Sequence, residues 1–143
     1  MDEKRIPILV GSGQITQREQ DPLVALSPMD LTASAGFKAA DDTHIGKSIL
    51  KKLDTIVVIR SFSDTSWRFK CPFGKYSNPP LSLSKRLGAE NVNRLIYTYP
   101  GGNMPQWCVN RMFEMVTRGE LEIGMIAGGC LLYTSDAADE CSC

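Results

Sequence analysis

Two glycines and an asparagine stand where a predicted strand gives way to a predicted helix, and this pattern could bind an anion or an oxyanion. The segment is Gly101-Gly102-Asn103, ahead of a helix expected to run to about residue 118. Glycines let a backbone approach a ligand closely, and the first turn of a helix offers free N–H groups and a positive dipole end. Such a turn can hold a carboxylate, a thioester oxygen or an oxyanion. The alternative is a purely structural turn that needs a positive φ, with Asn103 as the helix cap.

A second glycine pair, Gly11-Ser-Gly13, follows an apolar run and invites a nucleotide-binding interpretation. The third glycine of such a loop is missing, because Thr16 holds its position. An acidic ligand for a ribose is missing too, since Arg60 stands at the end of the second predicted strand. We therefore interpret the pair as a plain strand-to-loop turn.

Candidate nucleophiles and metal ligands are sparse. The only histidine, His44, lies in a polar stretch and is expected at the surface. Cys108 lies inside the third predicted helix at core spacing, and we interpret it as a small buried residue. No base lies near Cys108 in sequence, so we predict no catalytic residue. The odd cysteine count argues against a disulfide framework, and no pair has metal-ligand spacing, so we predict no metal site. The five cysteines are Cys71, Cys108, Cys130, Cys141 and Cys143.

Aromatic side chains crowd a long predicted connection over residues 61–78. Trp67, Phe69 and Phe73 could stack on bases or cover an acyl group. Aromatic residues in a long loop more often pin the loop to its domain, and we favour that interpretation.

Composition narrows the possible partners. The 143 residues are 43% apolar, enough for a core, and carry 16 basic and 16 acidic side chains. This balance gives no electrostatic reason to expect nucleic acid as a partner. No apolar run is long enough to span a membrane, and the first residues do not resemble a signal peptide. We expect a cytoplasmic protein.

The elements that must position these residues alternate along the chain. Continuous apolar runs predict buried strands over residues 6–10 and 54–59, and two further strands are expected over residues 95–99 and 121–127. Ser27-Pro28 and Asn78-Pro79 are typical helix starts, and Gly88 is a typical helix end. The order strand, helix, strand predicts an α/β fold with a mainly parallel sheet covered by helices. The face expected to pack from the first helix comprises Met29, Ala33, Phe37 and Ala40.

The last fourteen residues, 130–143, differ from the rest. Residues 130–140 resemble the translation of a sequencing-library adaptor read through into the reading frame. They follow Gly128-Gly129, and their sequence has neither the pattern of a turn nor the pattern of an element that packs into a core. We therefore treat residues 130–143 as a non-native tail that should be exposed, and residues 1–129 as the folding unit.

Three stretches carry a resemblance to a known family: residues 5–14 with 26–31, residues 53–61, and residues 99–129. The third is the most specific and begins Tyr99-Pro-Gly-Gly-Asn-Met-Pro-Gln106. Together they resemble the thiolase-like branch often labelled acetyl-CoA acetyltransferase, close to the sterol-carrier-protein type of thiolase. The resemblance implies that residues 1–129 are a partial thiolase N-terminal domain, the first half of that fold.

The resemblance also implies a function and a departure from it. It places the acylated cysteine of working thiolases at Gly102, and Cys108 lies six residues deeper in the helix. The family's histidine and second cysteine belong to a C-terminal half that this sequence does not contain. The parent would be a homodimeric acyl-CoA acyltransferase-type protein of lipid metabolism, with the coenzyme A thioester as substrate or ligand and no other cofactor. The chain as given should be inactive. A non-catalytic acyl-CoA-binding or lipid-binding partner protein is the alternative, and a fragment with no stable function is a third.

In such a half-fold the third helix would lie at the centre of a sandwich of two halves. Part of its apolar surface would then lack a partner. That surface is expected to comprise Met104, Trp107, Cys108, Met112 and Met115.

Overall fold

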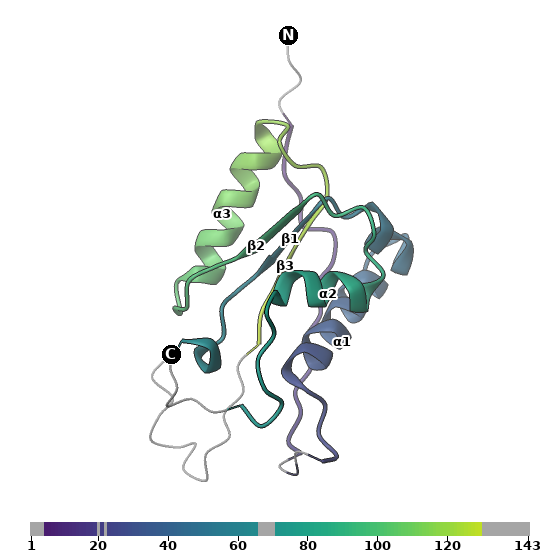
Figure 1. Ribbon diagram of the computed structural model, residues 1–143. Coiled ribbons are helices and arrows are strands. Elements are labelled where there is room, and N and C mark those ends of the chain that lie inside the picture. Colours follow the sequence, from purple (N-terminus) through teal and green to yellow (C-terminus); the bar gives the residue numbers. More distant parts are fainter. Residues whose placement is uncertain (1–4, 20, 22, 66–70, 130–143) are drawn as a thin grey trace.

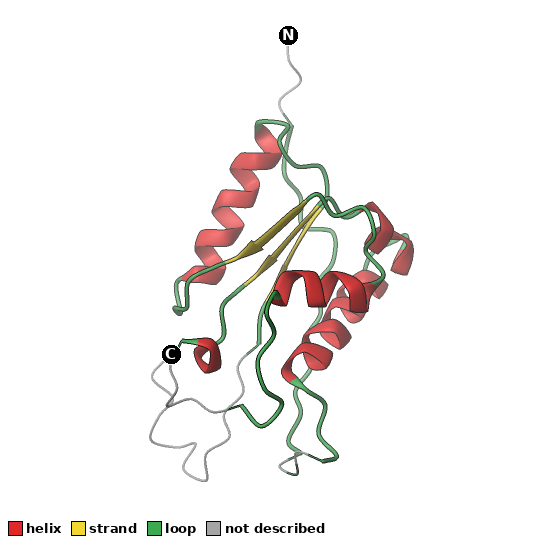
Figure 2. Cartoon of the chain, in the orientation of Figure 1, coloured by secondary structure: helices red, strands yellow, loops and turns green. Residues whose placement is uncertain are grey.

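The computed structural model describes residues 5–19, 21, 23–65 and 71–129. Its parallel sheet has the strand order β2-β1-β3, with β1 at Thr55–Val58, β2 at Arg94–Tyr97 and β3 at Gly124–Ala127. All four residues of β1 are buried, because β1 is central and both of its faces are covered. Helices α1 (Pro28–Asp41) and α2 (Pro79–Leu87) lie on one face, and α3 (Met104–Thr117) lies on the other (Figures 1 and 2). The predicted α/β fold with a parallel sheet is confirmed.

The period of two along β1 divides the core into two layers. Ile56 and Val58 point into the layer under α1 and α2, and Val57 points into the layer under α3. The short 3-10 helix η1 (Gly46–Lys52) closes the first layer with Ile49 and Leu50. The apolar run expected to form a buried strand therefore does so, and it anchors both helical layers.

The helix starts form as the sequence predicts. The Ser27 hydroxyl accepts a hydrogen bond from the Asp30 amide at 3.2 Å, and Asn78 Oδ1 accepts one from the Leu81 amide at 3.1 Å. Proline follows each cap, where its missing N–H costs nothing. Gly88 ends α2 with φ +65°, a left-handed conformation that favours glycine.

The predicted strand over residues 6–10 is wrong. Within the described residues this segment pairs with no strand, and Leu9 is 82% exposed. Apolar composition alone does not build a strand, because its backbone N–H and C=O groups also need a partner in the sheet. The strands expected over 95–99 and 121–127 do form, although β2 begins one residue earlier and β3 is shorter than predicted.

The segment that follows residue 10 is held against α1 by its two glycines. A Cβ on Gly13 would lie 2.3 Å from the Ala35 carbonyl oxygen, and one on Gly11 would lie 2.3 Å from the Ala39 carbonyl oxygen. The Ser12 amide donates to Asp42 Oδ2 at 2.9 Å. The glycines serve a close approach of backbone to helix, which explains the pair without a nucleotide.

Gly13→Ala is expected to displace this segment from α1, because the new methyl group would overlap the Ala35 carbonyl. The measurement is hydrogen exchange of the Ser12 amide, whose protection should fall about tenfold or more as its bond to Asp42 is lost. Gln14→Ala, an exposed change in the same segment, is the matched control. Unchanged protection in the Gly13 variant would contradict this packing.

The apolar surface expected for α3 is divided between two sides. Cys108, Met112 and Met115 are buried against the sheet, and Met104 packs beside them. Trp107 is 55% exposed on the outer side. The 3.6-residue period turns the three buried residues toward Val57 of β1, so the part of this surface without a partner in the described residues is the outer side that bears Trp107.

Residues 130–143 lie outside the described residues, as do Trp67 and Phe69. The predictions about the tail and about the pinning role of these two aromatic residues therefore remain predictions. No helix in the described part of the chain combines the length and the apolar character that a membrane crossing needs.

Candidate functional site

The turn at Gly101-Gly102-Asn103 lies at the carboxyl edge of the sheet, between the end of β2 and the start of α3 (Figure 1). Gly101 has φ +152°, and its carbonyl accepts a hydrogen bond from the Met104 amide at 3.1 Å. The expected positive φ is therefore present, at Gly101. Gly102 and Asn103 are exposed to solvent.

Asn103 occupies the cap position of α3 but does not cap it with its side chain. Its backbone is already helical (φ −85°, ψ −12°), whereas a capping side chain reaches back from an extended backbone. Its Oδ1 lies 3.0 Å from the place where a Cβ on Gly101 would stand. The prediction of an asparagine cap is wrong for this reason.

The turn keeps backbone donors available. Within the described residues, neither the Gly102 amide nor the Asn103 amide donates a hydrogen bond. Pro105 in the first turn of α3 contributes no N–H. Two exposed amides at the positive end of a 14-residue helix can stabilise a carbonyl oxygen or an anion.

Cys108 is placed where it cannot act at this turn. Its side chain is 1% exposed and packs with Val57 and Met112 beneath α3. Burial raises the pKa of the Cys108 thiol, which disfavours the thiolate that a nucleophile needs. The interpretation of Cys108 as a small core residue is confirmed.

The other residues considered from the sequence are dispersed. His44 is exposed after α1, as expected, and it is remote in sequence from the α3 turn. Gly11 and Gly13 pack against the backbone of α1. Cys71 is half-buried beside Pro28 and Tyr76, in a hollow at the carboxyl edge.

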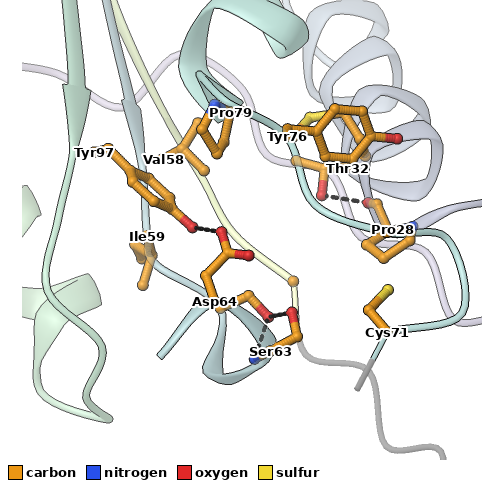
Figure 3. A pocket seen from close by; sticks show the side chains of 14 residues that line it. Pro28, Thr32, Val58, Ile59, Ser63, Asp64, Cys71, Tyr76, Pro79 and Tyr97 are labelled. Atoms are coloured by element: carbon orange, nitrogen blue, oxygen red, sulfur yellow. Dashed lines mark hydrogen bonds between the residues drawn. The ribbon is translucent and has the colours of Figure 1, made fainter. Parts of the chain in front are cut away.

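A polar cluster at the same edge was not predicted from the sequence. The Tyr97 hydroxyl donates to Asp64 Oδ2 (Figure 3). The central carbon of the Arg60 guanidinium lies 5.6 Å from the centre of the Tyr97 ring, over its face. Arg60 also donates from Nη2 to the Asp64 carbonyl oxygen at 3.1 Å. Burial, and then the hydrogen bond to the Asp64 carboxylate, raise the pKa of Tyr97 well above its usual range. The sequence could have indicated this cluster through the places of its residues at or after the ends of predicted strands, because the carboxyl ends of parallel strands meet at one edge of the sheet.

No protein-family model matches the chain, and no curated protein matches it. Among solved structures, the crystal structure of a monomeric SCP2-thiolase-like protein type 1 from Mycobacterium smegmatis superposes with a TM-score of 0.70. The match covers 88% of this chain at 24% sequence identity. The chain has a thiolase-like fold. It spans 24% of the length of that neighbour.

The thiolase-like fold gives the three parallel strands and their helices a known architecture. At 24% sequence identity this likeness shows the fold.

Proposed function

We propose that this chain is part of a thiolase-like, cytoplasmic acyl-CoA acyltransferase-family protein of lipid metabolism, and that its α3 turn seats an acyl-CoA thioester without forming an acyl-enzyme. The thiolase-like fold supports the family, and the position of the turn at the carboxyl edge supports the site. The residues proposed to bind are Gly101, Gly102 and Asn103.

The proposal is carried by one observation: the α3 turn has two free backbone amides and, at Gly102, no thiol. Acyl transfer through a covalent intermediate needs a thiolate to take the acyl group and a base to remove an α-proton. Gly102 has no side chain to acylate, and Cys108 is buried away from solvent. The turn retains the donors for a thioester oxygen but has no group to attack the thioester.

A non-catalytic acyl-CoA-binding or lipid-binding partner protein is the second candidate, and the same missing thiol favours it. The two candidates differ in the parent sequence beyond residue 129. A histidine motif and a Cys-x-Gly motif there would favour an enzyme, and their absence would favour a binding protein.

The family resemblance also implies a homodimer, whereas the Mycobacterium smegmatis neighbour is described as monomeric.

Two results are expected when the purified chain meets its proposed ligand. Acetyl-CoA should shift the amide resonances of Gly102 and Asn103, because these N–H groups are the proposed donors, and free coenzyme A should shift them less. Acetoacetyl-CoA thiolysis should be undetectable, and peptide mass spectrometry should find no acetyl group on Cys108, since that thiol is 1% exposed. A stoichiometric thioester on Cys108, or no shift at the turn at millimolar acetyl-CoA, would contradict the proposal.

A further inference from the structure

The outer edge of β3 has no strand beside it. β3 pairs with β1 on one side, and no other strand in the described part of the chain pairs with it (Figure 2). The carbonyl oxygens of Ile123 and Ala127 accept hydrogen bonds from amides on the β1 side. Because backbone groups alternate in direction along a strand, those of Gly124 and Ile126 point away from β1. An edge of this kind is a template for a further strand.

The sequence of β3 does nothing to protect this edge. Strand edges are commonly blunted by a charged side chain or a proline. β3 consists of Gly124-Met-Ile-Ala127 and has neither. β2, the strand at the opposite edge of the sheet, begins with the exposed, charged Arg94. Of the two edges, the β3 edge is therefore the more open to pairing.

Residues 6–10 are a second segment without a strand partner. They are uncharged, and their large apolar side chains are mostly exposed. In an extended segment the amides of Ile8 and Val10 point to one side, and the amide of Leu9 points to the other side together with the position of Pro7, which has no N–H. Only the Ile8 side can therefore donate without a gap. Proline belongs in an edge strand, so this segment is suited to be the outermost strand of a sheet.

Within one copy, residues 6–10 do not follow β3. At one end, a Cβ on Gly119, just after α3, would lie 3.3 Å from Arg5 Cζ. At the other end, Gly11 packs against the Ala39 carbonyl of α1. The two helices lie on opposite faces of the sheet, so the segment crosses from one layer to the other instead of running along the strand (Figure 1).

We infer that residues 6–10 of a second copy of this chain pair with the outer edge of β3, and that the exchange is reciprocal. Each copy then gives one strand and receives one, which closes a two-fold dimer. Two unpaired backbone rows satisfy each other, and neither segment carries a charge that would repel its partner. The residues from Gly11 onward keep their place on α1. This interface does not depend on acyl-CoA binding at the α3 turn.

The test uses the direction of the amides. Ile8→Pro removes a donor from the side that pairs with β3, whereas Leu9→Pro removes one from the opposite side and is the matched control. Both positions are exposed, so neither change disturbs the core. In sedimentation velocity, the unsubstituted chain and Leu9→Pro should form dimers with similar dissociation constants, and Ile8→Pro should raise the dissociation constant about tenfold or more.

Amide hydrogen exchange shows where the second copy binds. Protection of the Gly124 and Ile126 amides should rise with protein concentration, because these groups would pair only in the dimer. Met125, whose amide faces β1, should be protected at every concentration, and Leu95 at the outer edge of β2 should not change. A chain that stays monomeric, equal dimerisation of the two proline variants, or added protection at β2 in place of β3 would each overturn the inference. Protection of Gly124 and Ile126 that is independent of concentration would overturn it too.

Discussion

The 143-residue chain is expected to bind a hydrophobic dye, to self-associate, and to lack a sharp cooperative melt. Ile6, Ile8 and Leu9 are 78%, 73% and 82% exposed, and Trp107 and Phe113 add apolar surface on the outer side of α3. Each large apolar side chain left in water forgoes roughly 1.5–3 kcal/mol of burial. Net domain stability is only about 5–15 kcal/mol, so a few such losses are enough to leave the fold marginal.

The residue 6–10 segment should account for much of this behaviour. The double variant Ile8→Lys with Leu9→Glu should reduce dye fluorescence several-fold and shift the sedimentation profile toward monomer. The reason is that the two charged side chains interrupt the contiguous apolar surface through which copies of the chain associate. Ser48→Lys, an exposed change in η1, is the control for added charge alone. If the unsubstituted 143-residue chain is a monomer with one steep thermal transition well above room temperature, residues 1–129 form a self-sufficient domain, and the half-fold account is contradicted.

Asp54→Ala is expected to cost about 2–4 kcal/mol, which is a large share of a marginal fold's stability. Asp54 Oδ2 accepts the Glu122 amide at 2.8 Å and the Ile123 amide at 3.3 Å. The Asp54 carbonyl accepts the Asn93 amide at 2.8 Å and the Arg94 amide at 3.0 Å. Asp54 thus joins the amino ends of all three strands. Alanine would remove the two hydrogen bonds that its carboxylate accepts and keep those of its backbone.

The readout for Asp54→Ala is the dispersion of amide signals and the far-UV circular dichroism at 25 °C. The variant should lose the dispersed signals of β3 first, because its side chain binds the segment that leads into that strand. Asp41→Ala, an exposed acid at the end of α1, should leave the spectrum unchanged. A fully dispersed spectrum in Asp54→Ala would show that the backbone ladder alone holds the strands.

Local chemistry explains what the sequence predicts well. Ser27-Pro28 and Asn78-Pro79 determine helix starts through contacts within three residues, so no knowledge of the fold is needed. The run at residues 54–59 is apolar at every position of its centre, which suits a strand covered on both faces. These features were predicted with the correct type and nearly correct bounds.

The features that were missed depend on contacts distant in sequence. Residues 6–10 are as apolar as β1, yet no described strand pairs with them. Tyr97 and Asp64 are 33 positions apart and meet only because parallel strands end at one edge. Asn103 was expected to cap α3 from its type alone, and its helical backbone prevents this.

The proposal that the α3 turn seats a thioester without a nucleophile is tested most directly by placing a thiol there. Gly102 does not have a positive φ, so Gly102→Cys is compatible with the backbone. A thiol at a helix N-terminus has a lowered pKa. Its thiolate would attack the carbonyl carbon of acetyl-CoA, the bond from that carbon to the coenzyme A sulfur would break, and coenzyme A would leave as the thiolate.

The measurement is the rate of acetylation at each cysteine, followed by peptide mass spectrometry at fixed acetyl-CoA. The Gly102→Cys thiol should be acetylated about tenfold or more faster than the exposed control thiol of Ser48→Cys, because the turn positions the thioester and stabilises its oxyanion. Cys108 should stay unmodified in both variants, and neither should catalyse thiolysis, since no histidine is available at the turn. Equal acetylation rates at the two introduced thiols, or acetylation of Cys108 in the unsubstituted chain, would contradict the account.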